Sequence, residues 1–93
     1  MSPAVSEAIV QYLGYETDSY PQSREEVLQS KGFFTRRNVR KVLRFVNALE
    51  PDWTRVDLVG AGNWAEQQTA KRFPSLTKQA ISALGWAATY GWK

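Results

Sequence analysis

Apolar residues recur along residues 35–49 at the three- and four-residue spacing of an α-helix. At about 100° per residue, six of them fall within one arc of about 160°. Five cations share an arc of about 140° on the opposite side, and no acid interrupts them. The segment is therefore predicted to be a helix that buries one face and presents cations on the other. The apolar face comprises Val39, Val42, Leu43, Phe45, Val46 and Leu49, and the cationic face comprises Arg36, Arg37, Arg40, Lys41 and Arg44.

Two helices are predicted before this one, from the same spacing and from residues typical of helix ends. Pro3 suits a first helical position, and the helix that it begins is expected to end at Gly14. Ser23 and Glu26 have the Ser-x-x-Glu spacing of a capping box. They predict a second helix over residues 24–31.

After the basic helix, glycines divide the pattern. Residues 52–59 are predicted to form a short helix, with a strand over residues 56–59 as the alternative. Gly60 and Gly62 are expected to end this element, and a further helix is predicted over residues 64–73.

Ser75 or Thr77 is predicted to cap the last helix. Ser75 also has the Ser-x-x-Lys spacing of penicillin-recognising enzymes with Lys78, but those enzymes need further motifs that are absent here. The Gly-x-Gly-x-x-Ala pattern of residues 60–65 matches a dinucleotide-binding turn, yet no acid follows Glu66 to bind a ribose. We therefore assign helix caps and turns to these residues, rather than chemistry.

Composition agrees with a small helical protein and excludes several functions. The chain of 93 residues is 43% hydrophobic, so residues 1–93 are expected to form a single all-α domain, a compact bundle of five or six short helices. Cysteine and histidine are both absent, which excludes disulfides, structural zinc and Cys- or His-centred catalysis. We expect a non-enzymatic protein with no catalytic residue, no metal and no cofactor.

Neither a signal peptide nor a membrane span is predicted. The first residues lack a basic region and a sufficient apolar core, and nowhere do eighteen apolar residues follow one another. The protein is therefore expected to be cytoplasmic, with no membrane partner.

Residues 24–43 resemble the helix-turn-helix motif of bacterial DNA-binding regulators. Leu28 stands where a small residue is customary, which would force the two helices apart, and Phe33-Phe34 lengthen the turn by one residue. The positions that carry the resemblance are Gly32, four residues after Leu28, Thr35 as N-cap of the second helix, and Val39 facing the core.

The resemblance implies that the basic helix enters the major groove of double-stranded DNA with its N-terminal residues. Base edges would then face Arg36, Arg37 and Asn38, since arginine pairs with guanine and asparagine with adenine. Asn38 borders the apolar arc, so a local hydrogen bond near the helix start is at least as good a role for it as base contact. A homodimer is expected if the protein reads sequence, because one short helix offers few contacts. The expected nucleic-acid-binding residues are Lys31, Thr35, Arg36, Arg37, Asn38, Arg40, Lys41 and Arg44, of which Lys31, Arg40, Lys41 and Arg44 would contact phosphates.

The cationic face carries an energetic cost, which makes it informative. Repulsion between cations three and four residues apart costs roughly 1–2 kcal/mol. Arg36 and Arg37 also fall in the predicted first turn, where the helix dipole adds about 0.3–1 kcal/mol each. An anionic partner would recover this cost, and so would acids of the same chain. The candidates for internal neutralisation are Asp18, Glu25, Glu26 and Glu50.

Two alternatives to DNA remain open. The basic helix of a protein-interaction or inhibitory module could dock on an acidic protein surface, and RNA binding lies between the two. A protein-binding module would show an apolar hot spot beside the arginines, for which Phe33 and Phe34 are the candidates if exposed. Trp86 and Tyr90 could stack on unpaired bases, cover the end of the core or line a dimer contact.

Overall fold

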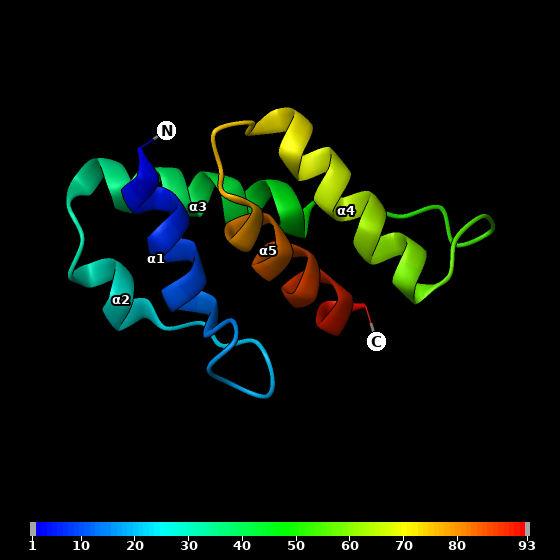
Figure 1. The fold of residues 1–93 in the computed structure, drawn as a ribbon, viewed down its shortest axis with the longest axis horizontal. Coiled ribbons are helices and arrows are strands. Elements are labelled where there is room, and N and C mark those ends of the chain that lie inside the picture. The colour runs from blue at the N-terminus through cyan, green and yellow to red at the C-terminus, as the bar shows by residue number, and fades with distance from the viewer. Residues whose placement is uncertain (1, 93) are drawn as a thin grey trace.

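The computed structural model describes residues 2–92, which form five helices and contain no strand. The predicted all-α class, and a bundle of five or six helices, are confirmed for this range. None of these helices has both the length and the apolar content that crossing a lipid bilayer requires. The helices are α1 (Pro3–Leu13), α2 (Glu25–Gln29), α3 (Phe33–Asn47), α4 (Leu58–Arg72) and α5 (Lys78–Gly91) (Figure 1).

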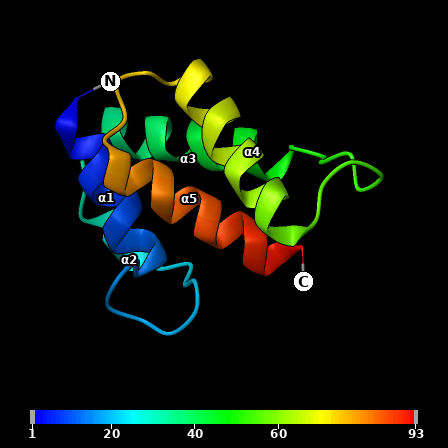
Figure 2. The ribbon, with the colours of Figure 1, turned by 45° about the vertical axis from the view of Figure 1, so that its right-hand side comes forward.

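The core lies where α1, α3 and α5 meet. α5 lies between α1 and α4 in both views, and α4 runs antiparallel beside it (Figures 1 and 2). α3 passes behind α1 and α5 in these views and packs against both. Four helices contribute core side chains that are at most 1% exposed: Val5 and Ile9 from α1, Leu28 from α2, Val39 and Val42 from α3, and Leu84 from α5.

α2 is shorter than predicted, and the capping box is wrong. The N–H groups of Gln22 and Arg24 donate to carbonyls of α1, at Leu13 (2.9 Å) and Tyr12 (3.1 Å). These bonds hold the segment along the end of α1, so the helix begins only at Glu25. Arg24 occupies the N-cap position, with no side-chain hydrogen bond there.

The N-cap of α3 lies three residues earlier than predicted. Gly32 is the N-cap in an extended conformation, and its carbonyl accepts from the N–H of Arg36 at 3.0 Å. Thr35 is therefore not a cap: it lies within the first turn, which it forms with Phe33 and Phe34. Arg36 and Arg37 follow this first turn, so the repulsion by the helix dipole that was predicted for them does not apply. The repulsion among the cations remains.

α4 is one helix where two elements separated by glycines were predicted. Asp57 caps it by accepting from the N–H of Gly60 at 2.8 Å, and the helix continues through Gly62. The predicted helix over 52–59 and its alternative strand are both wrong. Gly62 is buried against α5, where a Cβ atom would lie 2.7 Å from Oγ1 of Thr89. It thus permits a close helix contact and does not end a helix.

Thr77, one of two predicted caps, begins α5. Its hydroxyl accepts from the N–H of Ala80 at 3.1 Å. Ser75 is exposed in the preceding turn and is not a cap. The backbone N–H of Thr77 itself donates to the hydroxyl of Ser6 at 3.0 Å, which ties the start of α5 to α1.

Candidate nucleic-acid interface

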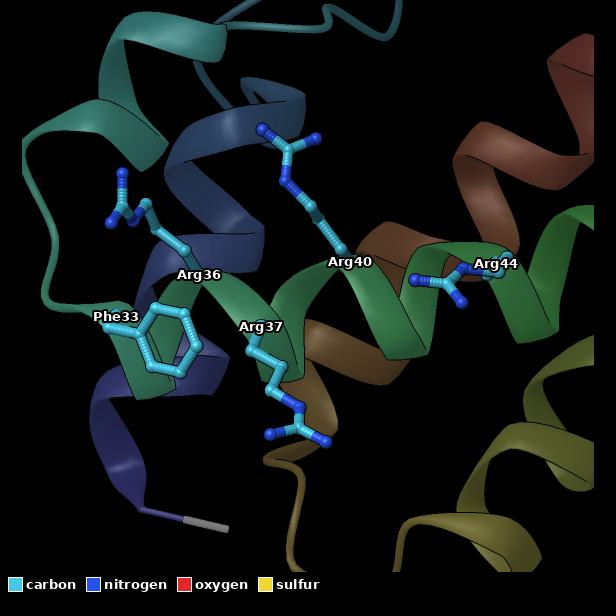
Figure 3. A pocket seen from close by; sticks show the side chains of 5 residues that line it. All are labelled: Phe33, Arg36, Arg37, Arg40 and Arg44. Atoms are coloured by element: carbon cyan, nitrogen blue, oxygen red, sulfur yellow. The ribbon is translucent and has the colours of Figure 1, made fainter.

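The inward face of α3 fixes the rotation of the helix. Val39 and Val42 are fully buried, Val46 is 4% exposed, and Phe45 packs edge-to-face on Phe73 with ring centroids 5.4 Å apart. The opposite side must then point outward. Figure 3 shows the guanidinium groups of Arg36, Arg37, Arg40 and Arg44 spread along this outward face of α3.

Most of the cations on this face have no acidic partner in the described range. Arg40 pairs with Glu25 of α2 at 2.9 Å, and both side chains are half exposed. Asp18 pairs instead with Arg24 at 2.8 Å, and Glu26 and Glu50 form no ion pair with α3. Internal neutralisation therefore reaches one cation of five. The four without an ion pair within residues 2–92 are Arg36, which is half-buried, and Arg37, Lys41 and Arg44, which are exposed.

Phe33 and Phe34 are exposed at the N-terminal end of the same face. Their side chains are 61% and 75% exposed, and their rings meet edge-to-face at 5.5 Å. In Figure 3 the ring of Phe33 lies between Arg36 and Arg37. An open hollow of about 280 Å³ lies on this face, lined by Phe33, Arg36, Arg37, Arg40 and Arg44. The face is thus cationic and aromatic together.

The other predicted contacts lie at the margins of this face. Asn38 is half-buried and lines a second hollow of about 430 Å³ with Phe34, Arg37, Lys41 and Arg44. The side-chain amide of Asn38 makes no hydrogen bond within the described residues, so the local hydrogen bond expected for this side chain is absent. Thr35 is half-buried on the inward side, and Lys31 is half-buried in the turn before α3.

Arg72, at the end of α4, extends the basic surface and was not predicted. A third hollow of about 340 Å³ brings it together with Lys41 and Arg44 of α3. Its guanidinium carbon lies 5.0 Å from the ring centroid of Phe73, a cation–π contact that holds the side chain beside α3. The sequence shows an acid-free basic segment from residue 67 onward, but not that its cations come next to those of α3.

Trp86 and Tyr90 do not belong to the α3 face. Trp86 is half-buried and packs on Tyr15 with ring centroids 5.4 Å apart. The hydroxyl of Tyr90 donates to the carbonyl of Ser19 at 3.1 Å. Both side chains cover the side of α5 that is turned away from α3.

Comparison with known proteins adds no evidence on the function of this chain. No family model, curated protein or solved structure matches the chain.

Proposed function

We propose that the protein binds double-stranded DNA through the outward face of α3, without catalysis, metal or cofactor. The observation that carries this proposal is the row of four cations on α3 that no acid of residues 2–92 pairs. Their mutual repulsion is recovered when phosphates neutralise them and release condensed counterions. A helix about 10–12 Å across also fits the major groove, which is about 12 Å wide.

The N-terminal half of α3 supplies the side chains best suited to bases. Arg36 and Arg37 would read guanine, and the exposed ring of Phe33 between them would contact a thymine methyl group. Phosphate contacts fall to the C-terminal half, where Lys41 and Arg44 are exposed and Arg72 adds a cation from α4. Sequence specificity would need a second copy of the chain, because one helix reads few base pairs.

Fluorescence anisotropy with a labelled duplex of about two helical turns tests this proposal. The double variant Lys41→Glu/Arg44→Glu should bind about 60-fold more weakly at 0.1 M salt, since each lost phosphate contact costs about eightfold. The matched control is Arg55→Glu/Lys78→Glu, which changes net charge equally at exposed positions outside the α3 face. Circular dichroism should show all three proteins folded. Absence of wild-type binding at low salt would refute the proposal.

A second function, docking on an acidic protein, is favoured by one observation. Phe33 and Phe34 are exposed beside the arginines, which is the arrangement of an aromatic and arginine hot spot. A pull-down with and without nuclease separates the two functions. A protein partner that is retained after nuclease treatment and lost in Phe33→Ser/Phe34→Ser favours docking on a protein. If RNA displaces the bound nucleic acid better than duplex DNA does, RNA is the favoured partner.

A further inference from the structure

A separate hollow of about 360 Å³ opens between α4 and α5, on the side away from α3. On α5, Leu84 and Ala87 line a surface shared with α3, whereas Gly85, Trp86 and Thr89 line this hollow. These two sets of positions lie on opposite sides of a helix with 3.6 residues per turn. The hollow is therefore independent of the α3 face, and its volume is at the lower end of the range for small-ligand sites.

Glu66 of α4 brings a negative charge into this hollow. Its side chain lies across Gly85, where a Cβ atom would be 2.8 Å from the carboxylate Oε2. Partial burial raises the pKa of the Glu66 carboxyl above its ordinary value of 4.5. Within residues 2–92 this carboxylate has neither a hydrogen-bond donor nor an ion pair. A cationic ligand would compensate this partly desolvated charge.

Three aromatic rings line the same hollow. The ring of Trp86 lies 5.4 Å from that of Tyr15, at 57°, and 5.8 Å from that of Tyr90, at 74°. Three aromatic side chains therefore form part of the wall of this hollow. The hydrogen bond from Tyr90 to Ser19 links the wall to the loop after α1. Aromatic faces attract cations, and weakly hydrated organic cations in particular.

We propose that this hollow binds an organic ammonium ion, with the charge beside Glu66 and the alkyl groups against Trp86 and the two tyrosines. A single carboxylate among aromatic rings is a poor site for Mg²⁺ or Ca²⁺, which need several oxygen ligands. An anion is excluded by the Glu66 charge, since no cationic side chain lines the hollow in the described range. The site would accept the ammonium group of a small amine or of a lysine side chain.

The test uses choline and n-butylammonium as probes and 3,3-dimethylbutan-1-ol as the neutral isostere of choline. Amide and indole shifts in ¹H–¹⁵N NMR spectra should move saturably at Gly85 and Trp86 with a cation, and not with the alcohol. Glu66→Gln preserves size and should weaken binding about tenfold. Glu26→Gln, an exposed acid on α2, is the matched control and should leave binding unchanged.

The proposal is overturned by the absence of a saturable shift with either cation, by equal binding of the alcohol, or by unchanged affinity in Glu66→Gln. A folded Trp86→Phe variant should bind more weakly than the wild type, because the smaller ring offers less π surface. Equal affinity in that variant would also count against an aromatic site. The stronger of the two cationic probes indicates whether the ligand is a quaternary or a primary amine.

Discussion

Replacing Glu25 with glutamine is expected to strengthen DNA binding. The Glu25 carboxylate holds Arg40 at 2.9 Å, so the wild-type face offers four cations of α3 rather than five. Glutamine keeps the size of the side chain but removes its charge, which frees Arg40 for a phosphate. The pair is half exposed on both sides, and such pairs contribute at most about 1 kcal/mol to stability. The variant should therefore remain folded.

The salt dependence gives the size of the effect. Each phosphate contact contributes about −0.9 to the slope of log K against log salt. The three wild-type contacts, from Lys41, Arg44 and Arg72, therefore give about −2.7, and a fourth from Arg40 gives about −3.6. Between 50 and 200 mM salt the wild type should lose about 40-fold in affinity and Glu25→Gln about 150-fold. At 0.1 M salt the variant should bind about eightfold more tightly.

Fluorescence anisotropy across a salt series measures both quantities. Glu26→Gln is the control, because Glu26 adjoins Glu25 in the first turn of α2 and forms no ion pair. It changes net charge by the same amount without releasing a cation of α3. Equal gains in the two variants would mean that only net charge matters. An unchanged slope in Glu25→Gln would mean that Arg40 does not reach a phosphate.

Three further predictions concern the fold. Leu28→Ala should lower the free energy of unfolding in urea by about 2–5 kcal/mol, because the fully buried Leu28 anchors α2 to the core; a loss under 1 kcal/mol would contradict that role. Gly62→Ala should lower the melting temperature, since overpacking against Thr89 costs about 1–3 kcal/mol and exceeds the gain in helix propensity. Gly91→Ala is the control: its new methyl group meets open space, so it should not lower the melting temperature. Glu66→Gln should raise the melting temperature at neutral pH, where burial disfavours the ionised carboxylate of the wild type. This gain in melting temperature should vanish as pH falls through the raised pKa of Glu66 to below 4.5. A gain that does not depend on pH would contradict this cause.

The orientation of α3 was predictable from the sequence, but its start was not. Apolar spacing places Val39, Val42 and Val46 inward, and all three are buried. Thr35 carries the stronger local preference for an N-cap, yet Gly32 caps the helix with backbone alone. The side chain of Thr35 turns toward the inward side, where it is half-buried, so packing outweighs a capping preference of about 1 kcal/mol.

α4 shows why local rules fail for glycine. Gly60 and Gly62 predict a helix end when only their neighbours in the sequence are considered. The close approach to Thr89 of α5 explains Gly62, and that contact depends on the tertiary fold. Arg72 was missed for the same reason, since only the packing of α4 against α3 brings it beside Lys41.

Mapping the DNA contact by NMR tests the central claim most directly. Addition of an unlabelled duplex to ¹⁵N-labelled protein should shift amide signals along the outward face of α3, at Phe33, Arg37, Lys41 and Arg44, and the shifts should fade as salt is raised. Signals of Ser82 and Trp86, on the far side of α5, should stay in place. Shifts centred on α5 or spread evenly over the surface, or none at low salt, would contradict a DNA interface on α3.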